Sequence, residues 1–260
     1  MSNGLLMSAP ISVFFAVVTL MMLAFFELGF RVNRFARSDT DEAASSSLGP
    51  MVGGLLGMLG FVLAFTFSMA ASQHQARKQG VIDDANTIGT AFLRADLLHE
   101  ASSATVRNLL REYVKIRVEV VEGGDMATAL ARTAELQRQL WHEVVAVARA
   151  TPDTNSALMV QAMNDVIDMH EKRLDAALRN RIPNSVWIAL SAITLLTMAT
   201  LGIQAGLSGK RRMAAVVPLT VAFAVLVTLV IDLNRPQQGL IKVSQASMIG
   251  LQQSMGEATN

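Results

Sequence analysis

Four histidines are the residues best suited to bind a metal or transfer a proton in this 260-residue chain, which has no cysteine. Transition metals require histidine, cysteine or carboxylate side chains at short, characteristic spacings. The histidines instead lie far apart, at His74, His99, His142 and His170. Their spacing predicts no metal site, and each is expected to be a solvated or a core histidine. The lack of cysteine excludes disulfides and thiol catalysis.

An acidic pair and a row of glycines are the remaining candidates for chemistry. Asp83 and Asp84 are neighbours on an expected helix, where adjacent side chains point in different directions, and we expect them on a solvated face. Gly53, Gly54 and Gly57 lie in an apolar segment and not after a strand, so they are interpreted as packing glycines. The residues indicate no nucleophile, general base, metal or cofactor. The protein is therefore predicted not to be an enzyme.

The uneven distribution of charge indicates a membrane protein. The chain is 52% hydrophobic and 17% charged, with a mean hydropathy of +0.39, whereas soluble domains are about a quarter charged. No charged side chain occurs from residue 49 to 76 or from 182 to 209. Uncharged apolar runs of this length can cross a bilayer core about 30 Å thick. The net charge of +1, with basic and acidic residues interleaved, gives no footprint for nucleic acid.

Four membrane helices are predicted, in two pairs. The first pair occupies residues 11–72, with spans at Ile11–Phe30 and Met51–Ser72, and the second pair occupies residues 184–231, with spans at Asn184–Leu207 and Met213–Ile231. Residues 1–10 contain no Lys or Arg, so the first span is interpreted as a retained helix and not as a signal peptide. The predicted fold class is an all-α membrane protein with four transmembrane helices (2+2) and an inserted soluble helical segment between the second and third.

The inserted segment, residues 73–181, is polar but favours helix throughout. Residues 73–98 are expected to continue the second span into water, because no Gly-Pro pair interrupts the chain there. Three amphipathic helices are expected to follow and to pack as a bundle, the last with His170 on its inward face. Their expected N-terminal caps are, in order, Ser102 or Ser103, Asp125 and Thr151. Residues 232–260 are predicted to form a polar C-terminal tail.

Two stretches of sequence resemble a known family. The second span and the residues after it read GMLGFVLAFTFSMAASQHQARKQG, and the fourth span ends in VIDLNRPQQGL. The first stretch resembles the second membrane helix of bestrophins, the pentameric anion channels, in which a segment of the F-V-L-G-F type lines the pore neck. The second is similar to the acidic stretch after their last membrane helix. More closely, the chain resembles the bacterial bestrophin-like proteins, and the order of spans agrees over most of its length.

The resemblance implies that Gly57, Phe61 and Phe65 are pore-lining. Their i, i+4, i+8 spacing stacks them on one helix face. In an assembly of several copies, these side chains would form rings around the pore axis. The edge of an aromatic ring is slightly positive, so edges directed at the axis would tolerate a dehydrated anion. An apolar constriction can also gate by dewetting. Packing of the two phenylalanines against neighbouring helices is the alternative interpretation of the same stripe.

The resemblance also implies partners and a location. It implies a homo-oligomer, a pentamer, in the lipid bilayer of the bacterial inner (plasma) membrane, passing an inorganic anion, with the soluble segment cytoplasmic. Basic residues near the span ends, six on one side and eight on the other, do not decide the orientation. The helix-end motif Asp232, Arg235 and Pro236 lacks the acidic cluster that a calcium ion with six to eight oxygen ligands requires. No metal is therefore predicted, and Asp232 and Arg235 are expected to cap and anchor the helix end.

Two other functions fit the same layout. A membrane-anchored sensor or interaction module would use the helical segment to bind a ligand or partner, and would favour a segment on the outer side of the membrane. A protein with the bestrophin fold could also conduct nothing, because fold does not fix function.

Overall fold

The chain forms two compact helical units in a computed structural model that describes residues 9–35, 42–121, 123–176, 182–235 and 239–257. The membrane unit comprises residues 1–74 and 181–242, and the soluble unit comprises residues 75–180 and 243–260. Within the described ranges the secondary structure is α-helical and contains no β-strand. The predicted all-α fold class is confirmed.

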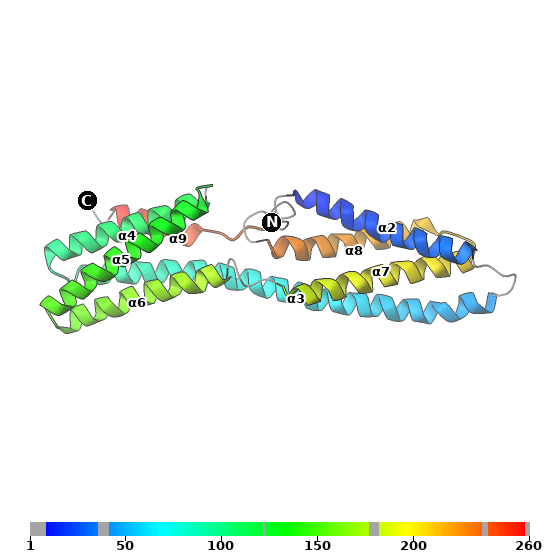
Figure 1. Ribbon diagram of the computed structural model, residues 1–260, viewed down its shortest axis with the longest axis horizontal. Helices are drawn as coiled ribbons and strands as arrows, with labels where there is room; N and C mark the ends of the chain where they lie inside the picture. Colours follow the sequence, from blue (N-terminus) through cyan, green and yellow to red (C-terminus); the bar gives the residue numbers. More distant parts are fainter. Residues whose placement is uncertain (1–8, 36–41, 122, 177–181, 236–238, 258–260) are drawn as a thin grey trace. The chain divides into compact units, whose positions relative to one another are not determined.

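Four helices of the membrane unit are long and apolar enough to cross a bilayer. They are α2 (Ile11–Phe35), the first part of α3 (Glu42–Ala95), α7 (Asn184–Leu207) and α8 (Met213–Leu233) (Figure 1). All four predicted spans are thus helices, and α7 has the predicted bounds. Pro183, which fixes its own φ and cannot donate a backbone hydrogen bond, lies at the N-cap of α7.

The first membrane helix packs along the last two, and glycines bring α2 and α7 into backbone contact. A Cβ added at Gly29 would overlap the carbonyl oxygen of Ala199, and one added at Gly202 would overlap that of Phe26. Small residues allow such a close approach. The resulting van der Waals contacts hold the two helices together in lipid, where no hydrophobic effect drives helices to associate. The crossing of α2 and α7 therefore requires glycine on both helices.

A second apolar cluster joins α3 to α7 and α8. Leu59 and Leu63 of α3 pack with Leu190 of α7 and with Val227 and Val230 of α8. Each of these side chains is at most 8% exposed. The buried face of α3 is thereby fixed inside the membrane unit, and its opposite face is left outside this cluster.

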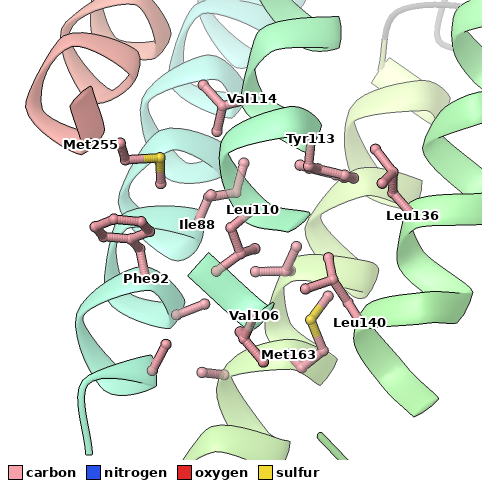
Figure 2. Close-up of a cluster of buried hydrophobic side chains, with 14 of the residues drawn as sticks. Ile88, Phe92, Val106, Leu110, Tyr113, Val114, Leu136, Leu140, Met163 and Met255 are labelled. Atoms are coloured by element: carbon pink, nitrogen blue, oxygen red, sulfur yellow. The ribbon is translucent and has the colours of Figure 1, made fainter. Parts of the chain in front are cut away.

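The soluble unit contains the second part of α3 together with α4 (Glu100–Val121), α5 (Met126–Ala150), α6 (Thr154–Leu174) and α9 (Ala246–Glu257). Helix α3 runs through the end of the membrane unit without a break, as expected from its sequence. Every helix contributes to one core, with Ile88, Leu110, Leu136, Met163 and Met255 fully or almost fully buried (Figure 2).

Two of the three predicted helix caps are wrong. Asp125 caps α5 as predicted, with its carboxylate accepting hydrogen bonds from the backbone of residues 127 and 128. Helix α4 begins at Glu100, ahead of both candidate serines. Helix α6 is capped by Asp153 and not by Thr151, because Asp153 forms a reciprocal capping box with Ser156. Thr151 instead ends α5.

The C-terminal segment is part of the soluble core, which the interpretation as a polar tail missed. Helix α9 packs against α4, and its Met248 and Met255 side chains are buried at 0% and 1% exposure. The two methionines are seven residues apart, a spacing that places them on one helix face. Both methionines of this short helix therefore face the core, whereas Ile249 is exposed.

Candidate pore helix and buried charge cluster

Within the described part of the chain, other helices cover the membrane part of α3 on one face only. Leu59 and Leu63 are buried, whereas Phe61 and Phe65 are 73% and 58% exposed. Gly57 lies on the same uncovered face, and a Cβ added there would meet no atom within 4 Å. The two phenyl rings therefore do not pack in the core of this chain. The structure places all three predicted pore-lining residues on one open face of α3.

The open face is apolar at its start and carries hydroxyl groups further on. Ser68 and Ser72 follow Phe61 and Phe65 at helical spacing, and both are exposed. No charged side chain lies on this part of α3. An ion passing along the face would meet aromatic rings first and hydroxyl groups next, with no fixed charge opposing it.

The glycines of α3 differ from those of the α2–α7 crossing. A Cβ added at any of the four would meet no atom within 4 Å of this chain; they are Gly53, Gly54, Gly57 and Gly60. Packing among the described residues thus requires none of them. Small residues in membrane helices commonly serve close helix contacts. Four that have no such role within the chain are available for contacts with another copy of it.

Residues at the C-terminal end of α8 tie three chain segments to it. The buried Asp232 carboxylate accepts hydrogen bonds from the backbone of Leu240 at 2.8 Å and of Ile241 at 3.0 Å. Arg235 donates to the carbonyl oxygen of Ala9 at 2.9 Å and lies over the Phe14 ring, 4.2 Å from its centroid.

Asn234 supplies the third tie, by accepting a hydrogen bond from the backbone of Ile182 at 3.3 Å. Pro236, the third residue of the helix-end motif, lies outside the described residues. In the described part of the chain, no group of three or more His, Asp or Glu side chains could hold a metal ion. Both described members of the motif thus make hydrogen bonds and hold backbone groups in place.

Comparison of the whole sequence with family models decides which proteins this chain is related to. The model described as "Bestrophin-like domain" matches residues 13–248. The chain belongs to the bestrophin-like family. The match includes all four membrane helices, the soluble unit up to the start of α9 and the helix-end motif. The predicted family is confirmed, and it is a family of the bestrophin channel type. No curated protein sequence matches the chain.

Solved structures show that the bestrophin-like chain also shares the bestrophin fold. A bacterial bestrophin homologue from Klebsiella pneumoniae superposes with a TM-score of 0.61 at 14% identity, covering 96% of this chain and 98% of that one. A variant of a Klebsiella pneumoniae homologue superposes with a TM-score of 0.62 at 13% identity, covering 97% and 100%. At this identity the likeness establishes the fold alone.

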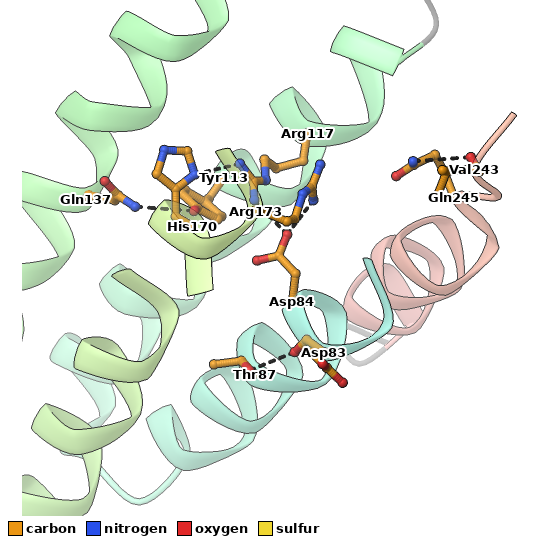
Figure 3. Close-up of polar contacts among 10 residues, drawn as sticks. All are labelled: Asp83, Asp84, Thr87, Tyr113, Arg117, Gln137, His170, Arg173, Val243 and Gln245. Atoms are coloured by element: carbon orange, nitrogen blue, oxygen red, sulfur yellow. Dashed lines mark hydrogen bonds and ion pairs between the residues drawn. The ribbon is translucent and has the colours of Figure 1, made fainter. Parts of the chain in front are cut away.

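The soluble unit of this bestrophin-like chain contains a buried charge cluster. Asp84, on α3, is fully buried, and one of its carboxylate oxygens accepts hydrogen bonds from Arg117 of α4, at 2.6 Å, and from Arg173 of α6 (Figure 3). The expectation that Asp84 lies on a solvated face is wrong. Its neighbour Asp83 is only half-buried and accepts a hydrogen bond from Gln79. The cluster connects three helices through one carboxylate.

A histidine and a tyrosine complete this cluster. Arg117 donates to Nδ1 of His170 at 2.7 Å, so that nitrogen carries no proton. Burial, and then the nearby Arg117 charge, lower the pKa of His170 to about 4. The Tyr113 ring lies edge-on to His170 and beneath the Arg117 guanidinium, and burial raises the pKa of its hydroxyl. His170 is thus a neutral core histidine, which was one of the two predicted alternatives, a solvated or a core histidine.

Sequence reasoning did not find this cluster, because its members are far apart in the chain. One signal was available on α4. Arg117 continues the spacing of the buried residues Val106, Leu110, Tyr113 and Val114. The helical period therefore predicts that this charged side chain lies on the buried face. A buried arginine requires a carboxylate partner. Nothing in the sequence identifies Asp84 as that partner over the other acids.

Proposed function

We propose that copies of this bestrophin-like chain assemble around α3 into a homo-oligomeric, anion-conducting channel. By resemblance to bestrophins the assembly is a pentamer, and Gly57, Phe61 and Phe65 form its neck. The membrane is the bacterial inner membrane, and the soluble segment is cytoplasmic. Membership of a channel family supports a transport role over an enzymatic one.

The observation that supports this proposal most is the open aromatic face of α3. Phe61 and Phe65 expose most of their surface although the helix is buried on its other side. Exposed apolar surface of this kind is commonly an interaction site. Contact with lipid would also satisfy it. The glycines beside the phenylalanines favour another helix or a narrow pore instead, because they reduce side-chain volume where no contact with a described residue requires it.

The chemistry of the face favours anions over cations. Phenyl rings that turn their edges toward an axis present the positive part of their quadrupole, and no carboxylate on this part of α3 would attract a cation. Ser68 and Ser72 could then donate hydrogen bonds to an ion that has lost water. The neck itself would limit conduction by dewetting, since it is apolar.

Planar-bilayer recording under a chloride gradient tests the proposal. The purified full chain is expected to give a current that reverses near the chloride potential. The variant carrying both Phe61→Ala and Phe65→Ala is expected to pass several-fold more current, because removing two rings widens the neck and weakens dewetting. Phe67→Ala is the matched control: Phe67 is 39% exposed and lies about a third of a turn around α3 from Phe61. It is expected to leave the current unchanged.

Two results would contradict the proposal. Silence from folded, oligomeric protein would favour the non-conducting or sensor interpretation. An equal change of current in the Phe67→Ala variant would show that the neck is not formed by the face of α3 that carries Gly57, Phe61 and Phe65. Single cysteines introduced into the cysteine-free chain, labelled from one side of the membrane, test the orientation separately. A soluble segment labelled from outside the cell would contradict the cytoplasmic placement and favour a sensor.

A further inference from the structure

A groove opens at the end of the membrane unit where α7 turns into α8. Its volume is about 180 Å³, and its residues come from α2, α7, the turn and α8. The side chains deep in the groove are apolar and include Phe26, Ala205 and Val216, all of them buried. Those at its rim are polar and include Gln204, Ser208 and Arg212. The groove is thus apolar at its base and polar at its mouth.

The position of the groove matches the boundary between hydrocarbon and water. Helix α7 ends at Leu207 and α8 begins at Met213, and both are uncharged apolar spans over the adjacent residues. The five residues between them are polar, glycine or basic. A molecule in the groove would therefore have its apolar part beside the span ends and its polar part at the interface.

Among the described side chains, positive charge exceeds negative charge at the mouth of the groove. Glu27 accepts hydrogen bonds from Arg211 of the turn at 3.0 Å and from Arg31 at 2.8 Å, so it is shared between two cations. Within the described ranges, Lys210 and Arg212 make no ion pair with any acid. Of these two cations, only Arg212 lines the groove.

Two of the three polar rim side chains have no hydrogen-bond partner among the described residues, whereas the third, Ser208, donates to the carbonyl oxygen of Gln204 at 3.2 Å. Over the residues that the structure describes, neither the Arg212 guanidinium nor the Gln204 side-chain amide makes a hydrogen bond. Arg212 is also the N-cap of α8 and adopts a left-handed backbone, with φ of 42°. Its side chain therefore starts beside the positive end of a 21-residue helix. A guanidinium presents several donors in a planar fork that suits a phosphate.

We propose that this groove binds one anionic phospholipid per chain, with part of an acyl chain beside Phe26 and Val216 and the phosphate at Arg212. An amphiphile of this kind meets both halves of the groove, whereas a free phosphate would meet only the rim. Opposite charge selects an anionic headgroup over a zwitterionic one. The site is independent of the proposed conduction pathway, since none of its residues lies on α3.

Native mass spectrometry of the delipidated full chain, titrated with phosphatidylglycerol or with phosphatidylcholine of the same acyl chains, tests this proposal. We expect one phosphatidylglycerol per chain, with about tenfold higher affinity than for phosphatidylcholine. Arg212→Gln should weaken phosphatidylglycerol about tenfold, since it removes a charge-assisted hydrogen bond. Lys210→Gln is the matched control, because it removes the same charge from the same turn outside the groove. The affinity of this variant for phosphatidylglycerol should change less than twofold.

A second pair of variants tests the apolar half. Ala215→Phe fills the groove and should abolish retention of the lipid, whereas Ala214→Phe adds the same ring to the exposed neighbouring position and should not. Equal weakening by Arg212→Gln and Lys210→Gln would overturn the proposal, because it indicates diffuse surface charge. So would unaltered binding in Ala215→Phe, or equal competition by glycerol phosphate, which has no acyl chain. A disulfide between two chains carrying Ala215→Cys would show that a second copy covers the groove, and would also overturn it.

Discussion

Replacing His170 by glutamine is expected to make the stability of the soluble unit much less sensitive to acid. In the folded chain Nδ1 of His170 accepts a hydrogen bond from Arg117, and the pKa of the histidine falls to about 4 from a usual value of about 6.5. The charged groups around it are Arg117, Asp84 and Arg173. A protonated ring would lose the hydrogen bond and place a cation beside two arginines.

The sign and size of the effect follow from the two pKa values. The unfolded chain takes up a proton near pH 6.5 and the folded chain only near pH 4, so acid favours unfolding over that interval. The contribution of the neutral, hydrogen-bonded His170 to the free energy of unfolding is fully present above pH 6.5 and is lost as the pH falls toward 4. At 1.36 kcal/mol per pKa unit, lowering the pH from about 7 to about 5 should remove about 2 kcal/mol.

Urea unfolding followed by the fluorescence of Trp141 measures this loss. Trp141 lies on α5 of the soluble unit, and Trp187 lies on α7, so a Trp187→Phe background leaves one reporter in the unit of interest. Glutamine at position 170 can accept the Arg117 hydrogen bond through its side-chain oxygen but does not titrate. His142→Gln on the exposed face of α5 is the control and should keep the wild-type slope. Equal slopes for the wild type and His170→Gln between pH 7 and pH 5 would refute this reasoning.

Two further predictions concern burial. Asp84→Asn should destabilise the soluble unit by about 3 kcal/mol in the same urea assay, because it leaves Arg117 buried without a carboxylate, whereas Asp83→Asn should cost about 1 kcal/mol or less; equal losses would show that the charge cluster contributes little. Gly202→Leu should prevent the contact of α2 with α7 and abolish folded protein, as judged by size-exclusion chromatography, whereas Gly60→Ala should fold normally. A folded Gly202→Leu protein would contradict the assigned crossing.

The membrane helices could be predicted because the bilayer imposes a simple rule on the sequence. The bounds of α7 agree with the prediction, since Pro183 and the polar turn after Leu207 mark both of its ends. Helix caps were harder to predict. Thr151 and Asp153 are both good caps by residue type, and only the reciprocal bonds with Ser156 decide between them. The continuous helix through residue 73 followed from the lack of any breaker.

Residues that act across long separations could not be predicted. Asp84 is 33 residues from Arg117 and 89 from Arg173, and no local pattern connects them. Helix α9 was missed for a related reason: it is short and mostly polar or small, and the burial of Met248 and Met255 depends on α4 being beside them. The open face of α3 was predicted as an aromatic stripe.

The glycine contact between α2 and α7 has a consequence for biosynthesis. Ala199, the residue against which Gly29 packs, is synthesised about 170 residues later, which takes roughly ten to thirty seconds at about 5–20 residues per second. During that time α2 has left the ribosome but lacks its main packing partner. Its surface must be held by lipid or by an insertion factor, and the order in which the helices are made differs from the order in which they pack. Delayed synthesis between the two pairs of spans would lengthen this period, in which the first helix is open to wrong partners.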